Sequence, residues 1–517
     1  MERIKVGLFF LFFLPLNLFS QQNLLPISSY FKDKLFSPFN ATSFSNGSFL
    51  PVCESEINLN SKIADSSKQY YFFSTALIKK HLVEIKGADY YLTISPTVEI
   101  SYGEDKGDTI PSRKFQNTRG FHIEGDLFKN FSFSTSFYEN QARYTNYERA
   151  YYISLGEFYP QYLGYASQNA VIPGAGRTKP FKGDGFDFAY AIGNVVYSPS
   201  KKIKVITGNN SHFIGSGYRS LLLSDNSINA PYLQTNIKIS QKWTFIYMRE
   251  RLMNLMRRPF TTSDESYYEP KALSTNYLTY QASKKLNISV FEGAIWSKGD
   301  SIKSTKVNPL FYNPIPGISE ILVSNKNTMS SLLGINSEYI FTAKHRVYSQ
   351  IAMSNFDTKN IGFQLGYRGY NFVNLKNFLL QLEYNYVPSQ LYASSNRRLN
   401  YSHYNLPLAH TKGNGFQEFI IRSNYEYQRF YIDVKIIIYK LEGFKSGSIL
   451  AVNKNSAPQS GQLQHEQIEV GYRFNRKMNL TLFGSYTYRS DDSSSSSITK
   501  FFNIGIRTGL INHYNDF

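Results

Sequence analysis

The chain carries one cysteine and has no long apolar run beyond its first twenty residues. Because Cys53 is alone, a framework of intramolecular disulfides is excluded. After residue 20, no segment reaches the roughly 18 consecutive apolar residues that a membrane-spanning helix needs, which excludes helical spans. A chain of 517 residues without disulfides or membrane-spanning helices must be stabilised by another architecture.

The residue patterns of common catalytic sites are missing as well. The bend at Gly215 and Gly217 is followed by neither GKS nor GKT, and Ser220 occupies the third glycine position of a dinucleotide fingerprint. No G-x-S-x-G or H-E-x-x-H motif occurs. We predict a non-enzymatic protein without a metal or cofactor. Glycoside hydrolysis needs two carboxylates that converge on one bond, and Glu383, Glu426 and Glu469 could in principle supply them inside the barrel predicted below. We expect these glutamates to pair instead with arginines of the same interior, which are Arg368, Arg422 and Arg473.

The N-terminus has the pattern of a secretory signal peptide, which we assign to residues 1–20. Arg3 and Lys5 precede the apolar stretch Val6–Phe19, and Ser20 is a small residue suited to cleavage. The apolar stretch is shorter than the ~20 residues of a membrane span, which disfavours the alternative of an uncleaved anchor. We therefore predict export through the secretory pathway.

Tyrosine and phenylalanine, by contrast, are abundant. There are 41 of each against 7 methionines, and aromatic residues make up 16% of the chain, yet the mean hydropathy is -0.34. This combination is typical of a transmembrane β-barrel, in which aromatic girdles mark both membrane interfaces and the interior is polar. The formal net charge of +18 indicates anionic glycans or lipid head groups as partners of an exported protein, and not nucleic acid.

Alternation of apolar and polar residues predicts where the barrel strands lie. In Tyr90–Tyr102, one row includes Ile94 and Ile100 and the other includes Ser95 and Glu99, with tyrosines at both ends of the apolar row. About eighteen such segments occur along the chain. Clear examples are Phe378–Val387, Glu418–Gln428, Arg429–Lys440 and Gln467–Phe474.

We therefore predict an all-β fold, an outer-membrane β-barrel of about 18 antiparallel transmembrane strands over residues 89–517. A soluble β-sandwich also has alternating strands, but it rarely places tyrosine on the same apolar face in strand after strand. The terminal Phe517 suits recognition by the outer-membrane assembly machinery. Residues 21–88 form a separate periplasmic or lumenal segment, in which Phe73, Leu77 and Leu82 have near-helical spacing. They predict a short helix within Ser66–Ile85.

A dense basic cluster stands in Tyr247–Phe260, where Arg249, Arg251, Arg257 and Arg258 lie among apolar residues. Two interpretations are open. The arginines pair with lumenal acids or lipid phosphates at a strand end, or they form a platform for an acidic polysaccharide, because guanidinium groups bind carboxylates in a bidentate manner.

The stretch Thr207–Gln234 resembles the segment that identifies the Wzi-type family of capsule-assembly outer-membrane proteins. In that family, an aromatic-Gly-x-Gly bend precedes a Ser-Leu-Leu run, Ser-Asn or Ser-Asp-Asn, and a proline. The matching residues here are Phe213, Gly215, Gly217, Ser220, Leu221, Leu222, Ser224, Asn226 and Pro231. Further segments are similar in the same order, and the chain is most similar to the gliding-motility-associated RemB-like branch. These segments are Leu286–Trp296, Val307–Pro314, Val347–Tyr367, Leu380–Tyr392 and His403–Ser423.

The resemblance implies a barrel that is partly occluded by inward-folded segments and that anchors capsular polysaccharide at the cell surface as a lectin. Residues 207–234 would then be an occluding segment, with its leucines against the inner wall and Arg219 near the ligand. Loop position and charge make further residues candidates for polysaccharide binding. These are Tyr392, Tyr401 and Tyr404 beside Arg397 and Arg398.

Three functions follow as alternatives. The first is retention of an anionic surface polysaccharide in the outer membrane, in support of gliding or adhesion. The second is a porin-like channel for solutes or oligosaccharides, which needs a continuous polar path through the lumen. The third is a structural subunit of a gliding or secretion complex. Outer-membrane lipid and lipopolysaccharide are expected partners in each case.

Overall fold

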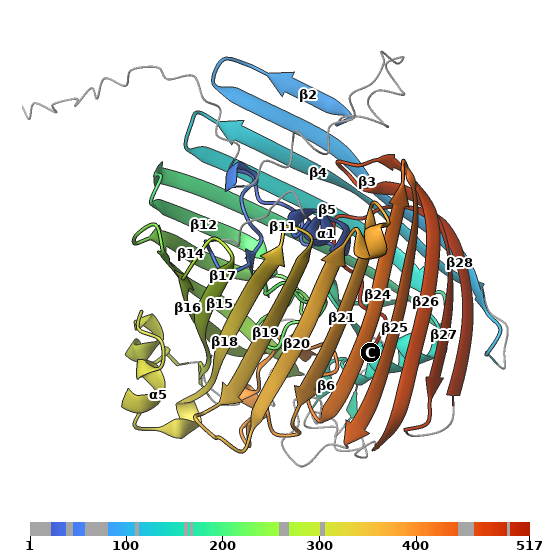
Figure 1. Ribbon diagram of the computed structural model, residues 1–517. Coiled ribbons are helices and arrows are strands. Elements are labelled where there is room, and N and C mark those ends of the chain that lie inside the picture. The colour runs from blue at the N-terminus through green and yellow to red at the C-terminus, as the bar shows by residue number, and fades with distance from the viewer. Residues whose placement is uncertain are drawn as a thin grey trace, which may run out of the picture.

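The computed structural model describes most of the chain (Figure 1). The described residues are 22–37, 45–56, 81–108, 113–159, 164–165, 169–257, 268–299, 305–442, 460–493 and 497–517. The predicted signal peptide lies outside them, as does most of the helix predicted within Ser66–Ile85. The end of that predicted helix is extended instead, because strand β2 (Val83–Lys86) pairs with the next strand along the chain.

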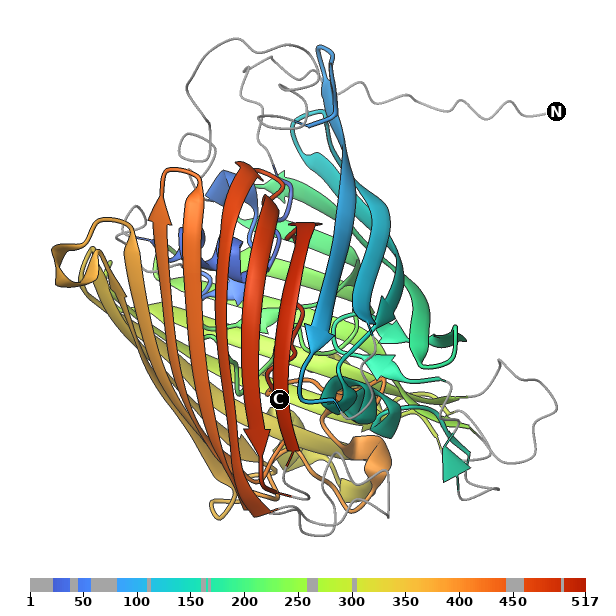
Figure 2. The ribbon, with the colours of Figure 1, turned by 90° about the vertical axis from the view of Figure 1, so that its right-hand side faces the viewer.

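Eighteen antiparallel strands form a closed barrel, as predicted. The chain closes on itself where the last strand pairs with the first, from Phe501 opposite Asp105 to Arg507 opposite Glu99 (Figure 2). The barrel strands are β3 (Tyr90–Asp105), β4 (Arg113–Leu127), β5 (Phe131–Arg143), β11 (Gly185–Ser200), β12 (Ile203–Asn210), β14 (Ala230–Lys238), β15 (Trp243–Arg257), β16 (Tyr268–Gln281), β17 (Leu286–Ser297), β18 (Met329–Thr342), β19 (His345–Ser354), β20 (Ile361–Tyr370), β21 (Phe378–Val387), β24 (Phe416–Tyr427), β25 (Phe430–Glu442), β26 (Ser460–Asn475), β27 (Leu480–Asp491) and β28 (Ser497–Thr508).

Shorter elements lie in the N-terminal segment and in the connections. The helices are α1 (Ser29–Leu35), η1 (Glu54–Glu56), α4 (Asn146–Ser154), η3 (Pro309–Tyr312), α5 (Ile318–Leu322), η4 (Lys326–Thr328), η5 (Phe372–Asn374) and η6 (Arg397–Leu399). The short strands besides β2 are β1 (Phe49–Leu50), β6 (Phe158–Tyr159), β7 (Gly164–Tyr165), β8 (Val171–Ile172), β9 (Gly176–Arg177), β10 (Lys179–Phe181), β13 (Phe213–Ile214), β22 (Ser402–His403) and β23 (Leu406–Pro407). None of the helices within the described ranges has the length and apolar character needed to cross a membrane.

The two faces of the wall differ as the alternation predicts. On β3, Ser95 and Ser101 are buried in the lumen, whereas Tyr90, Ile100 and Tyr102 are exposed on the outside. Exposed apolar rows of this kind follow from strand to strand around the barrel. An apolar exterior around a polar interior is the arrangement that a barrel needs in a bilayer.

The two ends of the barrel also differ. At one end, the connections are tight turns such as 201–202 and 343–344. At the other end they are long, as in 144–184, 298–328 and 388–415. In outer-membrane barrels, the short turns are periplasmic and the long loops are extracellular. We refer to the two ends as the turn end and the loop end.

The core of the molecule lies inside the lumen. There, β1 of the N-terminal segment pairs with β13, which belongs to the connection between β12 and β14. Buried apolar side chains of these elements form one cluster with residues of the wall and of 388–415. The predicted inward-folded segments are therefore present, and they fill much of the space that the strands enclose.

Candidate functional site

The inward segment 211–229 is shaped by its glycines. Gly215 has a φ of 107°, which favours glycine, and a Cβ there would overlap the amide of Gln350. A Cβ on Gly217 would lie 2.5 Å from the Arg219 carbonyl oxygen. Gly334 on β18 is needed for a related reason, because a Cβ at that position would overlap Leu222. The bend is thus held where only glycine fits.

The leucine run that follows is packed at the centre of the lumen. Leu221, Leu222 and Leu223 are buried in the main apolar cluster. The Ser220 hydroxyl accepts hydrogen bonds from the backbone N–H groups of Leu222 and Leu223. This short run is therefore neither a phosphate-binding loop nor a wall strand, but the middle of the lumenal filling.

The second inward segment, 388–415, clamps this run. Tyr392 and Tyr401 stack with ring centroids 5.9 Å apart. Their hydroxyls donate to the carbonyl oxygens of Leu221 and Leu222, at 2.7 and 2.8 Å. Burial raises the pKa of both hydroxyls well above its usual value, so they remain neutral donors. Ser224 and Asn226 add hydrogen bonds to the carbonyls of Ala409 and Pro407.

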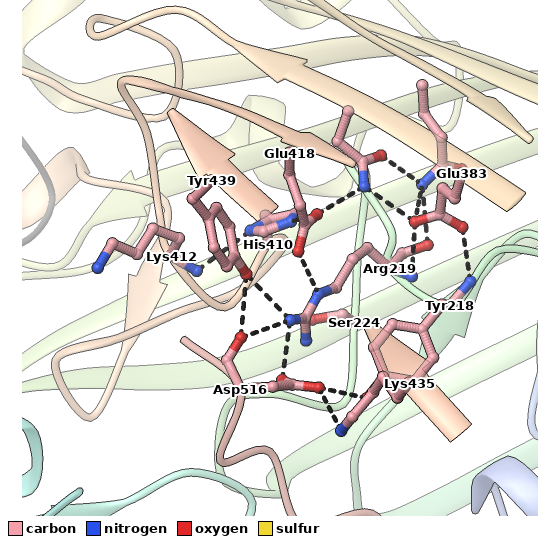
Figure 3. Close-up of polar contacts among 12 residues, drawn as sticks. Tyr218, Arg219, Ser224, Glu383, His410, Lys412, Glu418, Lys435, Tyr439 and Asp516 are labelled. Carbon is pink, nitrogen blue, oxygen red and sulfur yellow. Dashed lines mark hydrogen bonds and ion pairs between the residues drawn. The ribbon is translucent and has the colours of Figure 1, made fainter. Parts of the chain in front are cut away.

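Arg219 joins both segments to the C-terminal tail (Figure 3). Its guanidinium lies 3.2 Å from Glu418 Oε1 on β24 and 2.8 Å from Asp516 Oδ1. It also donates to the Tyr439 hydroxyl at 3.0 Å, and Lys435 Nζ lies 2.7 Å from Asp516 Oδ2. The side chains of Arg219, Glu418 and Asp516 are almost completely buried.

The electrostatics of this cluster favour the charged forms of its paired groups. Burial alone would raise the pKa of Asp516, but Arg219 and Lys435 outweigh burial and hold that pKa well below its usual range. His410 donates from Nε2 to the carboxylate of Glu418, at 2.6 Å. Burial nevertheless lowers the pKa of His410, with Glu418 only partly opposing it. Two cations and two carboxylates (Arg219, Lys435, Glu418 and Asp516) therefore balance in the lumen.

The C-terminal tail, 509–517, turns into the lumen after β28. Phe517 packs against Tyr151 of α4 with ring centroids 3.9 Å apart and is buried among aromatic and apolar side chains. It does not lie on the outer face of the last strand. The tail therefore connects the centre of the lumen with α4, which belongs to the long connection 144–184.

At the loop end, η6 presents two arginines around one carboxylate. Arg397 Nη2 lies 2.9 Å and Arg398 Nε 3.2 Å from Glu269 Oε1 of β16. The Arg397 side chain is 43% exposed, whereas Glu269 is buried. Because two guanidinium groups share one carboxylate, this mouth patch (Glu269, Arg397 and Arg398) carries excess positive charge at the surface.

The remaining predicted binding residues are not gathered at this patch. Tyr404 is half-buried against the apolar cluster of Leu155 and Leu255. Arg249 and Arg251 lie on the outer face of β15, opposite to the lumen-facing Met248. Only the backbone of Arg257 is described, and Arg258 lies outside the described residues. Arg219, Tyr392 and Tyr401 are buried, so they hold the lumenal segments together and present no surface to a polymer.

A polar cavity of about 280 Å³ runs beside the filling, along β24–β28, β3 and β4. Its lining extends from Asp33 of α1 at the turn end to Glu148 of α4 at the loop end. Ion pairs line it, among them Arg507 with Glu469 at 2.5 Å. Of the expected pairings between lumenal glutamates and arginines, that of Glu426 with Arg473 is confirmed, at 3.2 Å. Glu383 instead accepts hydrogen bonds from the backbone N–H groups of Tyr218 and Arg219. Arg368 and Arg422 both pair with Asp33 of α1.

Sequence reasoning missed Asp516, Glu418, Lys435, His410 and Glu269. His410 and Glu418 lie in the segment His403–Ser423 that resembles the Wzi-type family, but nothing in that segment indicated that they form a pair. Asp516, Lys435 and Glu269 belong to no motif. Glu418 and Lys435 do stand on lumen-facing positions of predicted strands, and this was the one signal that could have marked them.

The closed barrel, its apolar exterior and its unequal ends define the fold class of outer-membrane β-barrels. Among solved structures, the chain is similar to Wzi of Escherichia coli, an outer-membrane protein involved in group 1 capsule assembly and described as a carbohydrate-binding β-barrel. The TM-score is 0.55 at 11% identity, over 94% of this chain and 99% of Wzi. At this identity, the likeness shows the fold.

Other barrels are similar at lower TM-scores. OprD of Pseudomonas aeruginosa has a TM-score of 0.43 at 11% identity, covering 80% of this chain and 94% of OprD. A BenF-like porin from Pseudomonas fluorescens Pf-5 has a TM-score of 0.41 at 10% identity, covering 80% and 97%. No family model matches the sequence, and no curated protein matches it.

Proposed function

We propose that the protein is a non-enzymatic barrel of the bacterial outer membrane that binds or retains an anionic surface polysaccharide at its loop end. The observation that carries this proposal is the filled lumen. Segments 211–229, 388–415 and 509–517 interlock across it through Arg219, Tyr392 and Asp516. A wide solute pore needs an open lumen, whereas retention of a polymer at the surface does not.

The mouth patch supplies the chemistry for an anionic polymer. Arg397 and Arg398 exceed the charge of Glu269 by one, and Arg397 is accessible. A guanidinium binds a carboxylate through two parallel hydrogen bonds, as in a uronic acid unit. The net charge of +18 adds long-range attraction for such a chain.

The resemblance to the Wzi-type family supports the same proposal, because Wzi is itself described as a carbohydrate-binding barrel. A role in gliding motility or surface adhesion, as in the RemB-like branch, is the finer part of the proposal. Export by the secretory pathway, insertion by the outer-membrane assembly machinery, and contact with lipopolysaccharide or with gliding or secretion proteins belong to it as well.

The test is retention of labelled host polysaccharide by the barrel in vesicles. The double variant Arg397→Gln and Arg398→Gln should reduce retention about thirtyfold, since two charged contacts are lost, each is worth on the order of 1 kcal/mol, and about 1.4 kcal/mol corresponds to a factor of ten. The matched control is Lys201→Gln with Lys202→Gln, which removes the same charge from exposed residues of a turn at the opposite end. Equal retention by both double variants would contradict the proposed mouth site.

A second function, a channel for small polar solutes, is favoured by one observation. The cavity of about 280 Å³ has a lining that reaches both ends of the barrel. This function predicts steady single-channel conductance in planar bilayers, lowered when Ser485→Trp or Thr487→Trp narrows the cavity. An inserted barrel that stays silent and still retains polysaccharide would favour the first function.

A further inference from the structure

The connection between β17 and β18 folds outward, against the outside of the wall. Its residues 305–328, here called the outer flap, include η3 and α5. Figure 1 shows α5 outside the barrel, whereas α1 lies within it. Phe311 and Val323 of the flap pack on Trp296 of β17, which is fully buried in consequence.

The strand register shows that this contact is on the outer face. Tyr277 on β16 points inward, because its hydroxyl donates to the Gly47 carbonyl in the lumen at 2.6 Å. Its neighbour Asn276 therefore points outward. Asn276 lies opposite Glu292 of β17, and Trp296 follows Glu292 at an even spacing on the same face.

Under the flap lies a polar cluster on the outer wall. Asn276 Nδ2 donates to Glu292 Oε2 at 2.9 Å, and Arg249 Nη1 donates to Asn276 Oδ1 at 3.2 Å. The flap completes the cluster, because the Asn313 carbonyl accepts from Arg249 Nη2 at 2.8 Å and from Asn276 at 3.1 Å. Without the flap, a charged arginine and a glutamate would face the hydrocarbon of the membrane, where such groups are strongly disfavoured.

The helix α5 has two different sides. Ser319 and Glu320 are buried against the wall, and the Ser331 hydroxyl of β18 donates to Glu320 Oε2 at 2.7 Å. Ile321 and Leu322 are 69% and 59% exposed. A water-facing helix turn would place polar residues on this side.

The exposed apolar side of the flap continues the apolar exterior of the barrel. A Cβ on Gly317 would lie 3.9 Å from the Phe356 ring of the neighbouring β19–β20 turn. Phe356 itself is exposed, as are Ile361 and Phe363 at the loop end of β20. The apolar belt therefore reaches the height of the flap on adjacent strands.

We propose that the outer flap is a membrane-contacting element whose exposed face, with Ile321 and Leu322, lies in the acyl chains of the outer leaflet. It replaces the wall surface over the polar cluster and separates that cluster from lipid. Arg251, exposed on the outer face of β15 towards the loop end, is placed for the phosphates of the head groups. The inference rests on the proposed outer-membrane location and not on polysaccharide binding.

The test uses single cysteines labelled with an environment-sensitive fluorophore. Because Cys53 is buried and the only native cysteine, a Cys53→Ala background carries Ile321→Cys or Leu322→Cys. The protein is reconstituted in phosphatidylcholine vesicles with or without chain-brominated lipid. Leu365→Cys, in an exposed apolar row of β20, is the lipid reference, and Ser395→Cys, exposed in 388–415, is the aqueous reference.

Labels at 321 and 322 should be quenched by brominated chains about as strongly as the label at 365, and roughly twofold or more above the label at 395. Quenching by aqueous iodide should show the reverse order. If the labels at 321 and 322 are quenched by brominated chains and by iodide to the same extent as the label at 395, the exposed face of the flap is in contact with water. The proposal is then overturned in favour of a protein-docking surface. If the label at 365 is also unquenched, the membrane location fails with it, which separates the two outcomes.

Discussion

Arg219 and Arg249 are both nearly inaccessible to solvent, but they lie on opposite sides of the barrel wall. Arg219 is covered by inward-folded segments and pairs with Glu418 and Asp516. Arg249 is covered by the outer flap, and it donates hydrogen bonds to backbone carbonyls and to Asn276. In this barrel, the long connections decide which arginines are buried on either side of the wall, and the partners of each arginine decide how strongly the fold depends on it.

The largest expected effect is on the lumenal side. Arg219→Met leaves Glu418 and Asp516 buried with less compensation, so the free energy of unfolding should fall by about 3–5 kcal/mol. Unfolding by urea in detergent micelles, followed by circular dichroism, measures this change. The matched control is Arg397→Gln, which removes a partly exposed ion pair and should cost less than about 1 kcal/mol. Equal losses would mean that the lumenal cluster does not hold the inward segments.

Arg249→Met changes the buried arginine on the outer side of the wall. This variant removes hydrogen bonds but no direct ion pair, so the expected loss is about 1–3 kcal/mol, smaller than for Arg219→Met. The flap should loosen and expose Trp296 to lipid, so in vesicles with brominated acyl chains its emission should be quenched more strongly than in the parent protein. Trp243, the other tryptophan, is replaced by Phe in both proteins so that Trp296 alone is measured. Conductance in planar bilayers should stay unchanged, because Arg249 lies outside the lumen. A rise in the conductance of Arg249→Met above that of the parent protein would contradict the placement of Arg249 outside the lumen.

The smallest expected effect is a pH dependence confined to the lumenal side. Burial, with Lys271 nearby, lowers the pKa of His403 to about 3. As the pH falls, His403 therefore takes up a proton in the unfolded chain before it does so in the folded protein. Stability is lost as the pH falls below the ordinary histidine pKa of about 6.5. Between about pH 7 and pH 5.5 the loss should be on the order of 1 kcal/mol.

His403→Gln should reduce this slope while keeping an acceptor for the Met253 N–H group, which donates to His403 Nδ1 at 3.1 Å. Urea midpoints of both proteins at the two pH values measure the difference. Trp296 emission should not change over the same range, because no histidine contact of the flap is present among the residues the structure describes. If the change in urea midpoint between the two pH values is equal in both proteins, the pH dependence of stability comes from groups other than His403.

The strands could be predicted because their signal is local. Tyr90–Tyr102 alternates in the sequence and alternates in β3, and Gln467–Phe474 lies within β26. The predicted helix end at Val83–Ile85 was wrong for a non-local reason. Strand β28 pairs with β3 only from Glu99 onwards, so the first part of β3 has a free edge that β2 covers.

The candidate site was harder to predict. Arg219 and Asp516 are 297 residues apart, and neither belongs to a pattern that indicates the other. Arg249 and Arg251 stood out as a basic cluster, yet whether they faced lumen, lipid or a covering loop depended on the path of 298–328. Of the mouth patch, the sequence indicated the adjacent Arg397 and Arg398 but not Glu269, the carboxylate that both contact.

The residue pattern was enough to predict the closed sheet, a strand number of about 18 and the polarity of the two faces, because a period of two is a property of neighbouring residues in a strand. It did not indicate that inward segments pack across the lumen, that Arg219 is buried among carboxylates, or that the outer flap covers Arg249. Those outcomes depend on where long connections fold, and that choice is made by contacts between residues far apart in the chain.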